Sequence, residues 1–496
     1  MILDRLFQSV VWSCLGVLGL IVAVQSAAAE GTHHRMSPFL AIGPQAIPAA
    51  ASGPAYGLFT CQVLGVSPGV TCYDPYQIRH AYQIDSAIAA GYDGSGRTIV
   101  IIDAFQSPTL PTDLAGFDSF YGLPAASLTQ VAPDGLTPFD PNDDNMQGWA
   151  GEITLDVEWA HAIAPGAHIV LVLAKSNEDA DILSAAKYAV DHHLGDVISM
   201  SFGENESCLD PDLLLQYHDA FASATSQGIT LLASSGDEGA AQTTCDGNSW
   251  VKAASHPASD PLVTGVGGTE LHAARFCIHS ANPAINCDPT THPAPGTYDS
   301  EIAWNEPPGL VAEGSLSTGG GFSVIFDEPP YQQGTLHGGK QRAVPDVAYS
   351  AAVLHGVLTV FQGSFFLFGG TSAGSPQWAA ITAIADQKAG HALGFLNSAI
   401  YQIGKVNKAY PAAFHDITSG NNSVTEFDSN DDPVNVIGFA AGAGWDATTG
   451  TGSPIETSLM DYLIQYVSPG DGVAAIATTK PKPHPKPIVP GHVDPH

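Results

Sequence analysis

Basic side chains are scarce in this sequence. Lysine and arginine together number 16 among 496 residues, against 49 aspartates and glutamates, so the formal net charge is −33 at pH 7. Such a chain lacks the cations that bind nucleic-acid phosphates or anionic membranes, and we expect neither as a partner. At about pH 4 roughly half of the carboxyl groups would be protonated and the histidines charged. The composition therefore suits acidic surroundings.

Long apolar runs are missing after the first 30 residues, so no later segment is expected to span a bilayer. The N-terminal MILDRLFQSVVWSCLGVLGLIVAVQSAAAE has Arg5 early, an apolar stretch over 10–24 and a small-residue site at 27–29. This pattern is typical of a secretory signal peptide, here 1–29, although an uncleaved membrane anchor is the alternative. We expect a secreted, extracellular monomer with no membrane contact after signal cleavage.

Zinc motifs of the CxxC or HExxH type are also absent. Of seven cysteines, Cys14 lies in the signal segment, which leaves an even number. An even number of cysteines in an exported chain suggests disulfides, whose connectivity the sequence leaves open. We expect pairing between sequence neighbours: Cys61–Cys72, Cys208–Cys245 and Cys277–Cys287.

Proline is concentrated near the two ends of the chain. Residues 30–72 are rich in Pro, Ala and Gly and predict a loosely ordered lead-in, and 467–496 form a Pro/Lys/His-rich extended tail. The tail is either inert or bound to a wall polymer. The body, 73–466, is expected to form one domain.

Short apolar runs alternate with helical patterns in this body. Strands are predicted at 97–105, 167–174, 196–202, 229–236 and 261–268, and helices at 178–194 and 210–228. This alternation predicts an α/β fold with a mainly parallel sheet and helices on both faces. Active sites in such sheets lie beyond the carboxyl ends of the strands.

Two carboxylates, Glu152 and Asp156, lie four residues apart in GWAGEITLDVEWAHAIAPGA, 148–167. A helix from near Gly151 to before Pro165 would place both on one face. The apolar neighbours favour a position near the core, with a solvated acidic face as the alternative. A coupled pair can accept a proton in acid, where a histidine would already be charged.

Two loops offer further candidates. LFGGTSAGSPQWAA, 367–380, places Ser372 between a glycine turn and a helix start, where backbone N–H groups and the helix dipole favour an oxyanion. An ordinary N-cap serine is the alternative. LLASSGDEGA, 231–240, places Asp237 after a strand. A protonated Asp237 would donate a hydrogen bond to an oxyanion, and an Asx-turn residue is the alternative.

Together these motifs resemble those of the sedolisins, the serine-carboxyl peptidases of family S53, which have a subtilisin-like fold. GEITLDVE, SSGDEG, GGTSAGSP and HDITSGNN…AGAGWD occur in the family's order, and STGGGFS (317–323) and RAVPDVA (342–348) also match. The resemblance covers roughly residues 73–466. It implies an acid-acting, serine-type endopeptidase that cleaves proteins and peptides through an acyl-enzyme.

The resemblance also implies roles for individual residues. Ser372 resembles the nucleophile, Glu152 its general base, and Asp156 the partner that orients this base. Asp237 resembles the oxyanion-hole acid, assisted by the backbone N–H of Ser372. Asp103 occupies the place of a further acid that some members carry behind the pair.

The late motif is expected to bind one structural Ca²⁺. Asp416 and Asp446 are hard oxygen donors, and nearby glycines let backbone carbonyls turn toward a cation. By resemblance the ligands are these two carboxylates and the carbonyls of Ile417, Gly442 and Gly444. A tight loop with solvated acids is the alternative.

The chain departs from the family at its N-terminus. Sedolisins usually carry a long pro-domain, for which 30–72 are too short, so we expect the catalytic body to fold without one.

Two alternative functions remain to be weighed. A subtilase with a Ser–His–Asp triad would need a His-Gly-Thr-like turn after the first strand, and the sequence has none there. His161 and His168 look like structural or surface histidines. The other alternative is a secreted binding protein on an inactive peptidase scaffold, which the intact acidic and serine positions argue against.

Overall fold

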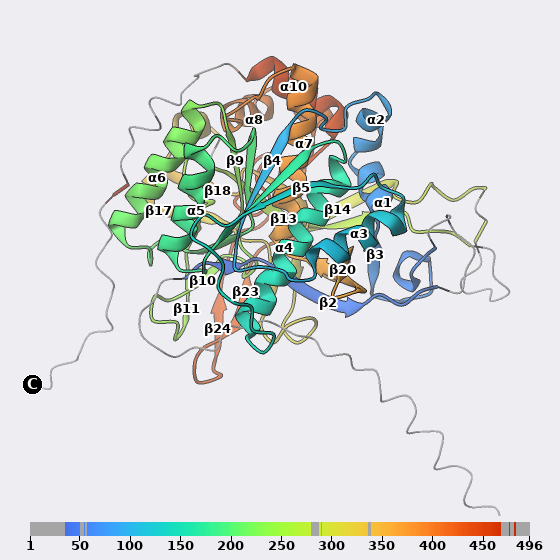
Figure 1. Ribbon diagram of the computed structural model, residues 1–496, viewed down its shortest axis with the longest axis horizontal. Helices are drawn as coiled ribbons and strands as arrows, with labels where there is room; N and C mark the ends of the chain where they lie inside the picture. Colours follow the sequence, from blue (N-terminus) through green and yellow to red (C-terminus); the bar gives the residue numbers. More distant parts are fainter. Residues whose placement is uncertain are drawn as a thin grey trace, which may run out of the picture.

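A mostly parallel sheet of eight strands forms the centre of the molecule (Figure 1). The structure is a computed structural model that describes residues 35–49, 54, 57–278, 287–288, 290–335, 339–467, 476 and 481–482. The predicted signal peptide, parts of the lead-in and most of the tail lie outside the described residues. No helix of the described part is both long and apolar enough to cross a membrane.

The central sheet has the order β14-β13-β9-β7-β4-β6-β5, with β19 also paired to β13. All neighbours are parallel except β13 and β14. The strands are β4 (Thr98–Ala104), β5 (Ser127–Val131), β6 (His168–Ala174), β7 (Val197–Met200), β9 (Thr230–Ser234), β13 (Thr264–Ala273), β14 (Tyr298–Ala303) and β19 (Val347–Ser350). The five predicted strands and the mainly parallel sheet are therefore confirmed.

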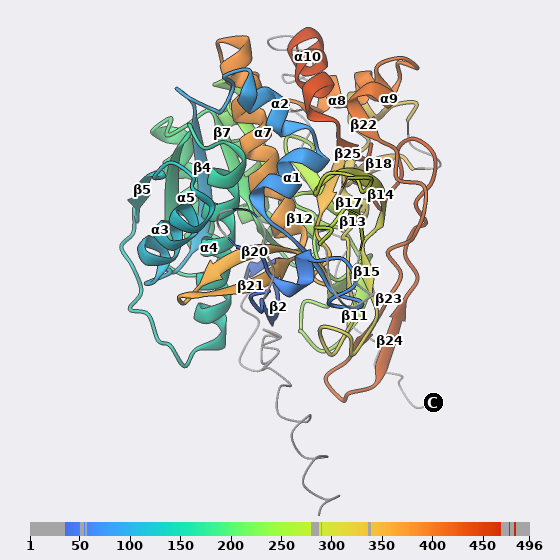
Figure 2. The same cartoon turned by 90° about the vertical axis from the view of Figure 1, so that its right-hand side faces the viewer.

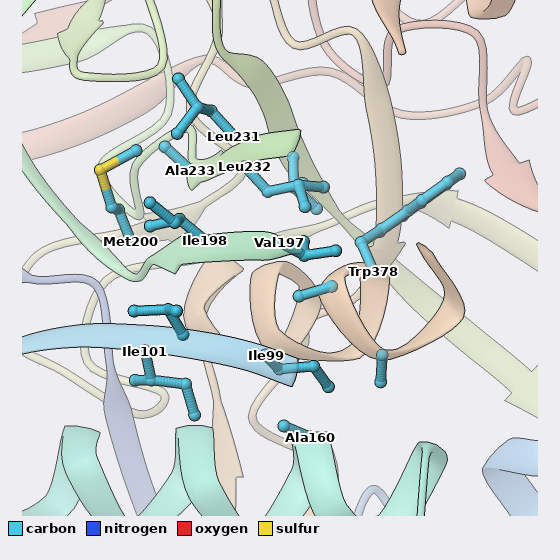
Figure 3. Packing of buried hydrophobic residues seen from close by; sticks show 14 of the residues in the cluster. Ile99, Ile101, Ala160, Val197, Ile198, Met200, Leu231, Leu232, Ala233 and Trp378 are labelled. Carbon is cyan, nitrogen blue, oxygen red and sulfur yellow. The ribbon is translucent and has the colours of Figure 1, made fainter. Parts of the chain in front are cut away.

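Helices cover both faces of this sheet. On one face α4 (Asp144–Ile163) and α7 (Gly374–Ala389) pack against each other and against β4, and on the other α5 (Asp179–Asp191) packs beside α6 (Pro211–Ser226). Figure 3 shows the apolar side chains between strands and helices: Ile99, Ile101, Ala160, Val197, Ile198, Met200, Leu231, Leu232, Ala233 and Trp378. Burying a large aliphatic side chain contributes about 1.5–3 kcal/mol, so each of these large apolar residues adds substantially to the stability of the domain.

Helix α4 begins earlier than its sequence suggests. Asp143 caps it by accepting the Met146 N–H (3.1 Å), and the helix ends at Ile163, before Pro165 as expected. The predicted start near Gly151 was too late because the capping signal lies upstream of the apolar periodicity. From Trp149 onward every residue of the helix is buried, which excludes a solvated acidic face.

The described part of the lead-in is not loosely ordered, contrary to expectation. Strand β1 (Ser37–Pro38) pairs with β8 (Phe202–Asn205), and β2 (Ala41–Gln45) joins a four-stranded sheet in the order β2-β21-β20-β3. The apolar side chains of Met36, Phe39, Leu58 and Phe59 are buried in the body. A Pro/Ala-rich composition is thus compatible with order here, because a few large side chains bury enough surface. Figure 2 shows β2 beside β20 and β21 at the lower edge.

The remaining elements are short and surround the central layers. The four-stranded sheet also contains β3 (Thr71–Tyr73), β20 (His355–Phe361) and β21 (Ser364–Gly369). The other helices are α1 (Pro75–Ala81), α2 (Ile84–Ala89), α3 (Leu110–Tyr121), α8 (Asn397–Gly404), α9 (Tyr410–Ala413), α10 (Glu456–Tyr466), η1 (Thr60–Gln62), η2 (Pro330–Gln332) and η3 (Thr371–Ala373). The other strands are β10 (Ala241–Thr243), β11 (Trp250–Lys252), β12 (Ser255–His256), β15 (Asn305–Glu306), β16 (Leu316–Ser317), β17 (Gly321–Asp327), β18 (Gln341–Val344), β22 (Phe414–His415), β23 (Val424–Phe427), β24 (Pro433–Val436) and β25 (Ser453–Pro454).

Three disulfides tie loops to this framework. They are Cys61–Cys72, Cys208–Cys245 and Cys277–Cys287, so the pairing expected between sequence neighbours is confirmed. Two of them join cysteines 10 and 11 residues apart and the third spans 37 residues, and such cross-links stabilise a fold mainly by restricting the unfolded chain.

Candidate active site

The candidate serine lies where the central sheet meets α7. Ser372 is fully buried in η3, the single turn that precedes α7. Its hydroxyl donates a hydrogen bond to the carbonyl oxygen of Ser201, which follows β7 (3.1 Å). No side chain caps α7, so Ser372 is not the ordinary N-cap that the sequence left open. The hydroxyl instead faces residues at the carboxyl end of the sheet.

Three carboxyl groups form a buried cluster beside this serine. Glu152 and Asp156 lie on α4 and Asp103 on β4, all fully buried. Burial raises the pKa of Glu152, the charges of Asp156 and Asp103 raise it further, and the Ser372 hydroxyl lowers it. Burial likewise raises the pKa of Asp156, which the Ser201 hydroxyl partly offsets.

Asp103 shows the same behaviour as the pair on α4. Burial raises its pKa, and the charge of Asp156 adds to that effect. Three acids in one dry site cannot all ionise, because each charge lacks water and repels the others. The cluster therefore keeps protons to higher pH than isolated carboxyls do, and its members share them.

Asp237 follows β9 and contacts the other side of the serine turn. Its Oδ1 accepts hydrogen bonds from the Thr371 backbone N–H (2.7 Å) and hydroxyl (2.8 Å). Its Oδ2 is buried and has no hydrogen-bond partner among the described residues. Burial raises the pKa of Asp237, and the neighbouring Glu238 adds to the rise. A protonated Oδ2 would be a free donor close to Gly370, two residues before Ser372.

Glycines make this close approach possible. Gly370 has φ +103°, and a Cβ there would come within 2.5 Å of Asp237 Oδ2. The STGGGFS segment is hydrogen-bonded to the backbone of the loop that carries Asp237. The Ser317 N–H donates to the Asp237 carbonyl, and the Gly319 N–H donates to the Gly236 carbonyl (both 2.7 Å). The glycine-rich motifs thus act as packing surfaces for the loop that carries Asp237.

Sequence reasoning missed two residues that hold this arrangement. The carbonyl of Ser201 accepts the hydroxyl of Ser372, and Thr371 holds Asp237. The position of Thr371 next to the serine was an available signal, whereas nothing in the local sequence marks Ser201. Two histidines, His161 and His168, contact Pro124 and Ser127 respectively, so both bond to structural neighbours as expected.

The two aspartates of the late motif are brought together by their loops. Asp416 follows β22 and accepts the backbone N–H of Gly444 (3.0 and 3.2 Å). Asp446 accepts the N–H of Gly442 (2.9 Å), and burial raises the pKa of Asp446. Ile417 is buried directly after Asp416. Asp416 thus lies against the loop that carries Gly444 and Asp446, and carboxylate oxygens are the ligands that a hard cation such as Ca²⁺ prefers.

A second group of side chains could also hold a metal ion. Glu270 and His272 lie on β13 and His355 begins β20, and their ligand atoms lie within 4.8 Å of one another. Both imidazole rings place a nitrogen 3.2 Å from Glu270 Oε1. A pocket of about 380 Å³ adjoins the two histidines. No spacing in the sequence marks this group, because His355 comes from a distant strand.

Comparisons with known proteins agree with this geometry. The model of the Subtilase family (Peptidase_S8) matches residues 142–403. Kumamolisin from Bacillus sp. (strain MN-32) is 34% identical over 423 residues, which cover 84% of this chain and 67% of kumamolisin. Sedolisin from Pseudomonas sp. (strain 101) is 32% identical over 401 residues, which cover 79% of this chain and 61% of sedolisin.

A solved structure shows the same fold. Pseudomonas sedolisin, a serine-carboxyl proteinase complexed with two molecules of pseudo-iodotyrostatin, superposes with a TM-score of 0.65 and 29% sequence identity. The match covers 80% of this chain and all of that one. The chain thus spans about two thirds of the length of the curated relatives named above.

Proposed function

This chain belongs to the sedolisin family of peptidases, and from that premise we propose that it is a secreted, acid-acting serine-carboxyl endopeptidase. The observation that supports the proposal best is the position of Ser372 between two kinds of buried acid. On one side lies the cluster of Glu152, Asp156 and Asp103, and on the other Asp237 with a free Oδ2. One group of acids is suited to move a proton, and the other to donate a hydrogen bond.

The proposed reaction is acyl transfer. Ser372 Oγ attacks a peptide carbonyl carbon while Glu152 takes the hydroxyl proton, and Glu152 then protonates the leaving amine. Asp156 holds Glu152 in place and shares its proton. The negative charge on the carbonyl oxygen is stabilised by the Ser372 backbone N–H and protonated Asp237. Water then releases the acyl group from Ser372.

The role of Glu152 is tested against a matched glutamate on the same helix. Glu158 is also fully buried, but its Oε2 accepts the Val360 N–H (2.9 Å). We expect casein hydrolysis by the wild type to peak below about pH 5, because Asp237 must be protonated while the cluster of Glu152, Asp156 and Asp103 has given up one of its shared protons. Glu152→Gln should lower kcat by about 10²–10⁴-fold at every pH, because the amide cannot take the serine proton.

Glu158→Gln is the control and should keep the wild-type pH profile, whatever it does to stability. Activity profiles are measured between about pH 3 and about pH 8, with melting temperatures to show that both variants are folded. Equal activity of the two variants, or an optimum above neutral pH, would contradict the proposed mechanism.

We also propose one structural Ca²⁺ at the late motif. The carboxylates of Asp416 and Asp446 would hold it, with carbonyls of Ile417, Gly442 and Gly444 completing the oxygen shell. Bound Ca²⁺ would supply charge neutralisation and cross-link two loops. In support, Asp416 accepts the backbone N–H of Gly444, two residues before Asp446, so the two loops are in contact.

Removal of this site should destabilise the fold more than it changes the chemistry. A cation that binds only the folded state at a hundredfold excess over its Kd stabilises by about 2.7 kcal/mol. Asp446→Ala should therefore lower Tm and make Tm insensitive to EDTA, whereas Asp134→Ala, an exposed loop control, should leave both unchanged. If EDTA does not change the wild-type Tm and elemental analysis finds no calcium, the proposal is wrong.

A further inference from the structure

Glu270 and His272 present a carboxylate and an imidazole on one side of β13. They are separated by one residue, and side chains two positions apart on a strand point to the same face. The backbone between and after them is held by Tyr73 of β3, whose hydroxyl donates to the Leu271 carbonyl (2.7 Å) and accepts the Ala273 N–H (3.2 Å). Both side chains therefore start from a strand whose position is fixed.

A third side chain that faces this pair comes from a different sheet. His355 is the first residue of β20, which pairs in parallel with β3 so that His355 lies opposite Thr71. The next residue of β3, Cys72, is joined to Cys61 by a disulfide. Because β13 belongs to the central sheet and β20 to the four-stranded sheet, the three side chains meet where the two sheets pack together.

The three ligand atoms are spaced like the ligands of one metal ion. His272 Nε2 and His355 Nδ1 each lie 3.2 Å from Glu270 Oε1, and all three atoms lie within 4.8 Å of one another. In a tetrahedral zinc site, bonds of about 2.0–2.1 Å place neighbouring ligand atoms about 3.3 Å apart, and both carboxylate–imidazole separations match this spacing. The two rings are inclined by 65° with centroids 5.0 Å apart, so they do not stack on each other. Each ring instead directs a nitrogen at the same carboxylate oxygen.

The protonation states of this cluster also suit a metal ion. The hydrogen bond from His272 lowers the pKa of Glu270, so its carboxylate is ionised near neutral pH. Burial lowers the pKa of His355, which favours the neutral ring that binds metals. The hydrogen bond to Glu270 raises the pKa of His272, so a metal ion must displace the proton that these two residues share. Once that proton is lost, the cluster offers one anionic oxygen and two neutral nitrogens.

We propose that Glu270, His272 and His355 form a binding site for a divalent transition-metal ion, and that Zn²⁺ fits it best. Two imidazoles and one carboxylate are a ligand set of zinc sites that leave a fourth position to water, whereas Ca²⁺ prefers oxygen ligands only. The adjoining pocket of about 380 Å³ has room for that water, and its walls carry Arg275 and Asp299, one charge of each sign. The bound ion links β13 to β20 and takes no part in the proposed peptidase reaction.

The test measures Zn²⁺ binding to the full-length chain by calorimetry and elemental analysis at about pH 7.5, where an ordinary imidazole is neutral. Ca²⁺ is present in about a hundredfold excess over Zn²⁺ to occupy oxygen-only sites. The wild type should bind one more Zn²⁺ per chain than the double variant His272→Ala/His355→Ala. Glu270→Gln should weaken binding at this site by at least about tenfold, because its amide oxygen carries no charge. His391→Ala, which changes an exposed histidine, should bind Zn²⁺ like the wild type.

Co²⁺ gives a second readout, which separates loss of the ligands from loss of stability. Added Co²⁺ should produce the visible absorption of a four-coordinate ion in the wild type and in His391→Ala, and Zn²⁺ should abolish this absorption by displacing Co²⁺. The double variant, checked for folding by circular dichroism, should lack the absorption. If the double variant does not fold, Glu270→Gln should show a shifted spectrum, and an unchanged spectrum there overturns the inference. Equal Zn²⁺ binding by the wild type and the double variant, no binding tighter than about 10⁻⁴ M, or binding that excess Ca²⁺ abolishes also overturns it.

Discussion

Ser372→Ala is expected to lower kcat by about 10⁶-fold while the protein stays folded. The hydroxyl is the only side-chain group of this residue that the proposed reaction uses, and its loss removes the atom that forms the acyl-enzyme. The surrounding acids and the backbone N–H remain, so a small residual rate above that of water is expected from them. The variant loses one hydrogen bond, to the Ser201 carbonyl, which is a modest cost to stability.

Ser375→Ala is the matched control for this experiment. Ser375 is as fully buried as Ser372 and lies one turn further along on α7, where its hydroxyl bonds to that of Ser199 (2.8 Å). It should therefore lose a similar amount of stability and keep its peptidase activity. Both are measured by peptide hydrolysis at the acidic optimum and by thermal unfolding. Activity of Ser372→Ala within about tenfold of the wild type would mean that another group is the nucleophile.

The second large effect is a loss of stability as the pH rises from acid to neutral and beyond. Carboxyl groups are buried in several parts of the domain besides the active site. Burial raises the pKa of Asp386 and of Glu456 to about 8, and that of Glu426 to about 9. The unfolded chain has ordinary carboxyl pKa values of about 4.

The sign of the effect follows from these shifts. A group whose pKa is higher in the folded state binds its proton more tightly there, so its stabilisation is complete below about pH 4 and is lost as pH rises through about 8 to 9. Each such group changes the free energy of unfolding by about 1.4 kcal/mol per pH unit between the two pKa values. We therefore expect Tm to be highest near pH 4 and to fall steeply toward pH 8.

Asp386→Asn tests this origin of the pH dependence. Asp386 Oδ1 accepts the Leu393 N–H (2.7 Å), and an amide can keep that hydrogen bond without ionising. The variant should show a smaller fall in Tm between about pH 4 and pH 8 than the wild type, whereas the exposed Asp134→Asn should show the same fall. A wild-type Tm that rises with pH over this range would contradict the prediction.

Local sequence signals were sufficient for much of the architecture. The apolar runs over 97–105 and 167–174 correspond to β4 and β6 because a strand buried on both faces must be apolar throughout. The disulfide pairing followed from short loops, such as that between Cys61 and Cys72. The motif set was enough to identify the family, because the motifs place candidate catalytic residues, such as Ser372, beside glycines.

The environment of the candidate site was decided by tertiary structure. The sequence left open whether Glu152 lies on a solvated or a buried face, and packing of α4 against α7 settled it, because burial depends on what covers a helix. The RAVPDVA motif matched the family, yet only the fold shows that Arg342 forms a fully buried double hydrogen bond with Asp346 (both 2.6 Å).

The largest difference between sequence and structure concerns the lead-in. Its composition predicted a loose segment, since Pro, Ala and Gly carry little apolar periodicity. The structure instead places Phe39 against Ser372, a residue from the other end of the domain. Periodicity and capping depend on a few adjacent residues, so the sequence by itself determined the five predicted strands of the central sheet, the helices over 178–194 and 210–228, and the family. Pairing of β1 and β2 with distant strands depends on surfaces that exist only after the chain has folded, and only the tertiary structure decided it.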